Sequence, residues 1–432
     1  MKTERQNVSE DVVVVTERNK RSKTSNNNGE PIPFDLTVEI CSRLPAKSVS
    51  RFRCVSKLWG SILGLPYFTE LFLTRSLARP QLLFACRKDN HVFVFSSLQP
   101  QNLDDNNASI KIPTLMLFLY PYTSSLLAAN YHMKIPYYAS SFKRCSSVRG
   151  LIFLGDERSL NGVEHKVSVI CNPSTGESLT LPKLKTRKRI GVRSYFGYEP
   201  IEKQYKVLSM TWGIYGTRDM DSEEHQVLTL GTRKPSWRMI ECWIPHSLYH
   251  TYNNVCINGV LYYPAVNTSS RGFIIVSFDF RSEKFRFVED TDTSISSYYR
   301  PPLINYNGKL GSLGSSGGFG GIGGSCTSIT LRVLEDAEKH EWSEHIYVLP
   351  AWWKYIFGGG YTDLCVVGVA RTNEIVLSCP FPSTPFYVFY YNTERNAIRR
   401  VEIQGLEAFK GRSVYTFLDH VENVNMKLLE GL

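Results

Sequence analysis

Residues 32–76 read IPFDLTVEICSRLPAKSVSRFRCVSKLWGSILGLPYFTELFLTRS, and their apolar residues recur at helical spacing. Leu36, Ile40 and Leu44 lie four residues apart, which places them on one stripe of a helix. Asp35 precedes this stripe and is the type of residue that caps a helix amino terminus. A proline directly follows Leu44 and ends the pattern, because proline cannot donate the next helical hydrogen bond. The spacing therefore predicts a short helix with one apolar stripe.

The rest of the stretch repeats this pattern. A second short helix is expected to carry Val49 and Phe52, and Ser56 is placed to cap a third whose stripe includes Val55 and Trp59. A fourth begins at the next proline. Short helices in so small a segment bury too little surface to be stable alone. Some of their apolar residues must therefore face another molecule, and we interpret the stretch as a docking module.

The run from Ile32 to Leu63 resembles an F-box. The matching features are a Pro and an Asp before the first helix, then E-I-x-x-R-L-P-x-K-S, then R-F-R-x-V-S-K-x-W. The resemblance implies a Skp-type adaptor as partner, a cullin scaffold beyond it, and membership of an SCF-type ubiquitin ligase. The alternative is a helical bundle that only caps the domain downstream. The positions implied to pack within the box or to meet the adaptor are Ile32, Pro33, Leu36, Ile40, Leu44, Pro45, Val49, Phe52, Val55 and Trp59.

The pattern changes after this module from helical spacing to the alternation typical of β-strands. His91–Phe95 is one example, and strands bounded by Gly, Asn, Asp or Pro recur to the end of the chain. The fold class is therefore α+β by segment: a small N-terminal helical module followed by a mostly β, propeller-like domain. We expect a disordered tail at 1–30, the F-box at 31–78, the β domain at 79–420 and a second tail at 421–432.

Two patterns repeat within the β domain. Asn258–Gly259 and Asn307–Gly308 are signals for tight hairpins, and Arg149–Gly150 is a looser copy. In the second pattern, an apolar strand ends in Asn or Asp and a short turn leads to another strand, as at Asn172, Asp279 and Asn392. Each interval between these three fits two blades, which predicts a kelch-like propeller of six to eight blades. A pair of β-sandwiches is the alternative.

This region also resembles a known family. The pieces CNPSTGE, FGYEPIEKQYKVL, VCINGVLYY and FIIVSFDFRSEKF look like the F-box-associated domain of plant F-box proteins. The resemblance implies a target-binding domain with a propeller-like fold and no known chemistry. It therefore agrees with the interpretation of the helical module as an F-box.

Composition and motifs give no sign of catalysis. The ten cysteines include no C-x-x-C pair, and the spacing of the histidines does not form a zincin motif. P-loops and kinase signatures are missing from the sequence. We therefore expect a non-enzymatic adaptor with no catalytic residue, no metal and no cofactor. The apolar runs are also too short to span a membrane.

The β domain contains two kinds of candidate target-binding residues. A basic cluster follows a proline turn and offers charges for an acidic or phosphorylated target. Aromatic pairs elsewhere are the residue types that dominate binding hot spots. The alternatives are a solvated loop for the basic residues and packing within blades for the aromatic ones. The candidates are Arg187, Lys188, Arg189, Tyr298, Tyr299, Trp352 and Trp353.

The net charge of +10 leaves a second class of function open, a propeller that binds nucleic acid. We consider this less favoured than a protein target, and a glycan-binding propeller is a third alternative. A basic run at Arg18–Lys23 has the composition of a nuclear import signal, and we expect the protein in the nucleus, the cytoplasm or both.

Overall fold

The computed structural model of the chain describes residues 32–425, except for 101–121, 138–144, 156–157, 161–162, 166–167, 187–189, 214–223, 233, 249–253, 290–300, 317–321, 324, 351–352 and 354–363. The tail expected at 1–30 and the basic run within it therefore lie outside the described residues.

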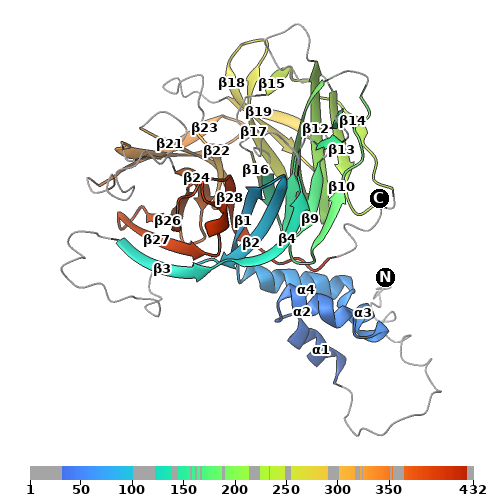
Figure 1. The fold of residues 1–432 in the computed structure, drawn as a ribbon. Coiled ribbons are helices and arrows are strands. Elements are labelled where there is room, and N and C mark those ends of the chain that lie inside the picture. The colour runs from blue at the N-terminus through green and yellow to red at the C-terminus, as the bar shows by residue number, and fades with distance from the viewer. Residues whose placement is uncertain are drawn as a thin grey trace, which may run out of the picture.

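Four helices form a small module beside a large β domain (Figure 1). They are α1 (Phe34–Cys41), α2 (Ala46–Arg53), α3 (Lys57–Leu63) and α4 (Pro66–Leu77). The module has its own core, in which apolar residues from all four helices pack together. The fully buried members are Val38, Cys41, Ala46, Val49, Leu63, Phe68 and Phe72.

The helix boundaries confirm some of the expected caps and correct others. Ser56 caps α3, since its side chain accepts a hydrogen bond from the backbone amide of Trp59 at 3.2 Å. Asp35 is not a cap: it lies in the first turn of α1, whose N-cap is Pro33. Val55 precedes α3 and does not belong to its buried stripe. Leu36 and Ile40 of the predicted stripe also face outward, because α1 buries Thr37, Val38 and Cys41 instead, and Leu44 lies beyond the end of the helix.

Among the described residues, the β domain contains six sheets of four or five strands, which are the blades of a propeller. Blade one contains β28 (Val414–His420), β1 (Gln81–Lys88), β2 (His91–Leu98) and β4 (Asn130–Pro136). Blade two contains β5 (Cys145–Val148), β6 (Leu151–Leu154), β9 (Val169–Asn172) and β10 (Glu177–Thr180). Blade three contains β11 (Ile190–Glu199), β12 (Gln204–Gly213), β13 (Glu224–Thr229) and β14 (Arg238–Ile240).

Three further blades complete the ring. Blade four contains β15 (His246–Leu248), β16 (Val255–Ile257), β17 (Val260–Asn267), β18 (Phe273–Asp279) and β19 (Lys284–Glu289). Blade five contains β20 (Leu303–Tyr306), β21 (Lys309–Ser315), β22 (Ser328–Asp336) and β23 (Glu341–Val348). Blade six contains β24 (Cys365–Val369), β25 (Glu374–Ser378), β26 (Phe386–Asn392), β27 (Ala397–Gln404) and β3 (Tyr122–Ala128). A short hairpin of β7 (Arg158–Leu160) and β8 (Val163–His165) and a 3-10 turn, η3 (Glu407–Phe409), stand apart from the blades.

Distant parts of the chain close the ring. β28, near the C-terminus, is the inner strand of blade one and pairs with β1. β3, from the N-terminal side of the domain, adds a parallel outer strand to blade six beside β27. The propeller prediction is confirmed, with six blades, and the sandwich alternative is excluded.

The two sequence repeats are hairpins at equivalent places in different blades. Asn258–Gly259, Asn307–Gly308 and Arg149–Gly150 join an inner strand to its neighbour, and all six residues have positive φ, as a type I′ turn requires. Asn172, Asp279 and Asn392 begin the turn between the third and fourth strands, counted outward from the axis, of blades two, four and six. The predicted interval of two blades between them is therefore confirmed.

The inner strands run toward the helical module. Lys203, in the β11–β12 turn, forms an ion pair with Glu70 of α4, and Arg371, in the β24–β25 turn, donates a hydrogen bond to the carbonyl oxygen of Leu77 at 2.8 Å. The opposite face of the propeller is therefore the one where the inner strands begin. Of the helices in the described residues, none is long and apolar enough to cross a membrane.

Candidate functional site

The helical module leaves a set of large apolar side chains in solvent although its own core is filled. They gather on α1, which lies farthest from the propeller, and around the junction of α2 with α3 (Figure 1). Their exposed fractions run from 37% for Phe52 to 67% for Val55. Burying such side chains is favourable by roughly 25 cal/mol per Å². The set comprises Ile32, Phe34, Leu36, Ile40, Phe52, Val55 and Leu58, and we call it the apolar face.

The ten positions singled out in the sequence divide into three groups. Val49 is a core residue, and Leu44 and Trp59 are half-buried against that core. Pro33 and Pro45 are exposed N-caps of α1 and α2. The remaining five, Ile32, Leu36, Ile40, Phe52 and Val55, belong to the apolar face. Phe34 and Leu58 also belong to the face, and sequence reasoning missed them.

An arginine of α4 fixes the position of α1. The Arg75 guanidinium donates to the backbone carbonyl oxygen of Glu39 at 3.0 Å and also contacts the Glu39 carboxylate and the Ser42 hydroxyl. Hydrogen bonds from Arg75, and then from Arg43, lower the pKa of Glu39. The carboxylate is therefore ionised at neutral pH, and the contacts hold the C-terminal half of α1 against α4.

The residues after β28 connect the module to the propeller. We expected a tail from residue 421, but residues 421–425, here called the strap, run between the two parts (Figure 1). Val424 is buried in the core of the helical module, and its carbonyl oxygen accepts a hydrogen bond from Arg53 at 2.7 Å. Residues 426–432 lie outside the described residues. The expected tail is thus wrong for its first five residues, because their burial and hydrogen bonds fix them in place.

On the propeller side, two asparagines hold the strap. The Asn172 side-chain amide donates to the carbonyl oxygen of Asn423 at 2.9 Å, and the Asn423 amide donates to the carbonyl oxygen of Arg149 at 3.1 Å. Asn172 and Asn423 are both buried. The helical module and blade two are therefore joined through buried polar contacts, and this fixes the direction in which the apolar face points.

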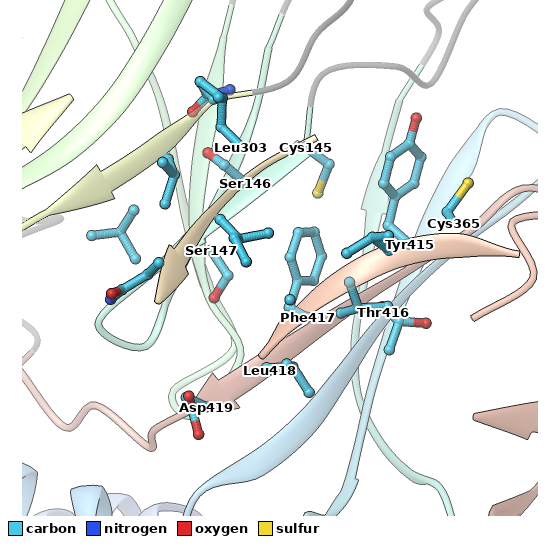
Figure 2. A pocket seen from close by; sticks show the side chains of 18 of the residues that line it. Cys145, Ser146, Ser147, Leu303, Cys365, Tyr415, Thr416, Phe417, Leu418 and Asp419 are labelled. Atoms are coloured by element: carbon cyan, nitrogen blue, oxygen red, sulfur yellow. The ribbon is translucent and has the colours of Figure 1, made fainter. Parts of the chain in front are cut away.

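A cavity of about 510 Å³ follows the propeller axis. All six inner strands contribute to it, with a mixture of small, apolar and hydroxyl side chains. Figure 2 shows Cys145, Cys365 and Phe417 around it, with Asp419 at the end of β28. A cavity of this volume falls in the range that binds small ligands or a single inserted side chain. One residue from each inner strand illustrates the lining: Cys145, Phe196, Cys256, Leu303, Cys365 and Phe417.

The predicted target-binding residues mostly fall where the structure gives no description. Arg187, Lys188, Arg189, Tyr298, Tyr299 and Trp352 lie outside the described residues. Trp353 is described, and its assignment as a surface anchor is wrong. Its indole is 1% exposed, packs edge-on against Tyr391 at 5.6 Å and donates to the carbonyl oxygen of Gly323 at 3.1 Å. Packing within the propeller, the alternative considered for it, is what the structure shows.

Comparison with known proteins agrees with this architecture. The family model described as the F-box domain matches residues 31–71, and the model described as the F-box associated beta propeller domain matches residues 81–421. The chain is 50% identical to F-box protein DOR of Arabidopsis thaliana over 430 residues, which covers 99% of this chain and all of the relative. It is 48% identical to F-box protein At5g65850 of the same plant, over 99% of both chains.

Proposed function

Because the chain belongs to the family of F-box proteins with an F-box associated β-propeller, we propose that it is the substrate-recognition subunit of an SCF-type ubiquitin ligase. In this role the F-box binds a Skp-type adaptor, which connects it to a cullin scaffold. The propeller binds a protein target. The chain itself carries out no chemistry, since a ubiquitin-loaded enzyme elsewhere in the complex supplies the thioester.

The observation that carries the proposal is the apolar face. Although its core is filled, the helical module still exposes large apolar side chains, and five of the seven that form the apolar face are positions that the F-box pattern singles out. An exposed apolar set of this kind marks an interaction site in a soluble protein. The helix α1, which carries the exposed Phe34, Leu36 and Ile40, lies farthest from the propeller, so an adaptor bound there would leave the propeller accessible (Figure 1).

We place target binding on the propeller face opposite the helices. The inner strands begin there, and the segments that join one blade to the next start and end there. Binding at that face would hold a target lysine at high effective concentration near the thioester. The fixed strap supports this role, because a rigid connection keeps the distance between adaptor and target within narrow limits.

Co-expression with a Skp-type adaptor tests the proposal. We expect the full chain and the adaptor to elute together in size-exclusion chromatography, and to recruit the cullin when it is added. Failure of the folded chain to form this complex would overturn the ubiquitin-ligase role. The nucleic-acid alternative would then be tested by titrating RNA and DNA at several salt concentrations, since it requires binding that weakens steeply with salt.

Two narrower expectations belong to the same proposal. We propose that the F-box extends over residues 31–78 and that the propeller begins at about residue 79. We also propose that the protein acts in the nucleus, the cytoplasm or both. Imaging of a fluorescent fusion would test this, and enrichment in any other compartment would contradict it.

A further inference from the structure

Blades three and four enclose a cluster of two histidines and one cysteine that the proposed function does not use. His225 lies on β13, His246 on β15, and Cys242 in the connection between β14 and β15. One potential ligand atom from each side chain lies within 4.8 Å of those of the other two. The sequence does not reveal the cluster, because its members come from three different elements and His225 is 17 residues before Cys242.

The three side chains form a set of soft and borderline donors of the kind that bind Zn²⁺. Zinc in proteins is usually four-coordinate, with sulfur ligands at about 2.3 Å and nitrogen ligands at about 2.0–2.1 Å, which places sulfur and nitrogen about 3.6 Å apart. The Cys242 Sγ and His246 Nδ1 atoms are 4.0 Å apart. A small side-chain rotation would therefore bring this pair to coordination distance.

A fourth donor lies beside them. The carbonyl oxygen of Ile244 is 2.9 Å from His246 Nδ1 and 3.4 Å from Cys242 Sγ. Together with His225, the cluster offers two nitrogens, one sulfur and one oxygen. Four donors match the coordination number of a closed tetrahedral site.

One atom of the cluster is unexplained without a ligand. His225 is 5% exposed, and its Nε2 atom is buried with no hydrogen-bond partner among the described residues. An unpaired buried polar atom destabilises the folded chain, and a bond to a metal ion would satisfy it.

The surroundings would hold the ligands in place. The Tyr263 hydroxyl lies 3.0 Å from His246 Nε2 and orients that ring, as a second polar group does in most metal sites. The ring of Phe285 packs edge-on against His225 at 5.1 Å. Both Tyr263 and Phe285 are buried, so water has little access to the cluster.

We propose that His225, Cys242 and His246 bind a Zn²⁺ ion, with the Ile244 carbonyl oxygen as fourth ligand, and that this ion fastens blade three to blade four. When the ion binds, the Cys242 thiol releases its proton to solvent and a sulfur–zinc bond forms, with no change in oxidation state. The site lies toward the propeller face opposite the helices. The β12 strand runs away from the Lys203 turn, which contacts α4, and Met210 near the end of β12 pairs with His225 of β13. The ion would thus stabilise the connection that carries the exposed Trp243 at that face.

Cobalt substitution in the purified full-length chain tests the proposal. We expect Co²⁺ alone to produce a thiolate-to-metal absorption band at one equivalent, and Zn²⁺ to remove it. Cys242→Ser should abolish the band and His225→Gln should weaken it. Cys379→Ser is the matched control, since the Cys379 thiol is also half-buried and donates to a carbonyl two residues on, that of Phe381, at 3.2 Å. A wild-type chain without the band, or a Cys242→Ser chain that keeps it, would overturn the proposal.

A second measurement uses only the wild-type chain, in case a variant fails to fold. Alkylation followed by mass spectrometry should show that Zn²⁺ protects Cys242 and leaves Cys379 as reactive as before. Equal reactivity of Cys242 with and without Zn²⁺ would contradict the site. This measurement does not depend on adaptor binding, so a negative result would contradict the zinc site without affecting the proposed function.

Discussion

The carboxylate of Glu422 accepts a hydrogen bond from the backbone amide of Ala46 at 3.1 Å, across 376 residues of sequence. Ala46 is the first residue of α2, and the N-cap of that helix, Pro45, has no side chain that can accept such a bond. The strap therefore supplies the cap that the helix lacks. The same residue donates its own amide to the Ser76 hydroxyl of α4 at 2.7 Å. Glu422 thus forms hydrogen bonds to two helices of the module, α2 and α4.

Replacing Glu422 should separate its role as a cap from the cost of burying its charge. Burial raises the pKa of Glu422, so the folded state penalises the ionised form, and this penalty grows as the pH rises through the folded pKa. Glu422→Gln keeps an acceptor and removes the charge, and it should be as stable as the wild type at pH 7 or more so. Glu422→Ala loses the cap and should cost about 0.5–2 kcal/mol.

Urea unfolding at pH 7 measures both variants of Glu422. Glu422→Gln should have a higher free energy of unfolding than Glu422→Ala. Equal stability of Glu422→Ala and the wild type would show that the contact with α2 contributes nothing.

Arg75 should be more important than Arg43, although both contact Glu39. The Arg75 side chain is the more buried and connects α4 to α1. The Arg43 side chain is exposed, and it pairs with Glu39 only four residues before it in the sequence. Arg75→Met should therefore loosen α1, because it removes the hydrogen bonds to Glu39 and Ser42 that hold this helix against α4. Arg43→Met is the matched control and should have a smaller effect. Limited proteolysis measures the protection of the helical module in both variants. Similar protection in the two would contradict this account.

His420, which is buried, and His132, which is half-buried, should make the propeller sensitive to acid. Burial lowers the pKa of His132 to about 4 and that of His420 to about 3. In the unfolded chain these rings take up protons below their ordinary pKa of 6.5, whereas in the folded chain they stay neutral. Stability is therefore fully present above pH 6.5 and is lost as the pH falls from 6.5 toward 4.

The slope of stability against pH tests this prediction. His420→Gln should reduce the loss of unfolding free energy between pH 7 and pH 5, and His345→Gln, at an exposed position on β23, should leave it unchanged. An unaltered slope in His420→Gln would exclude this histidine as the source.

The parts of the fold that were predictable from sequence are local. Asn258–Gly259 and Asn307–Gly308 specify their hairpins because few other residue pairs tolerate positive φ at both turn positions. The Asn172 pattern is also local, because the Asn172 side-chain oxygen accepts a hydrogen bond from the backbone amide of Ser174, two residues on, at 3.0 Å. Spacing between such turns was enough to indicate a propeller.

The parts that sequence could not supply depend on residues far apart in the chain. The cap that Glu422 provides and the meeting of His225 with Cys242 and His246 exist only after the blades have closed. The direction of the α1 stripe is a third case. Leu36 and Ile40 have the spacing of core residues, and only the burial of Thr37, Val38 and Cys41 shows that they face solvent.

The most direct test of the docking role is the affinity for a Skp-type adaptor measured by calorimetry on the full chain. Leu36→Ala with Ile40→Ala removes two exposed side chains of the apolar face without opening the core, whereas Trp59 is a poorer probe because it packs on that core. Buried anchors typically contribute about 2 kcal/mol or more each. Each alanine should therefore raise Kd roughly thirtyfold.

The matched control is Ile346→Ala with Val348→Ala, which removes two exposed apolar side chains from β23 of the propeller. We predict tight adaptor binding by the wild type and the control, and loss of most of the affinity in the Leu36, Ile40 variant with no change in its unfolding midpoint. Equal affinity of all three chains would contradict the assignment of the apolar face as the adaptor-docking surface.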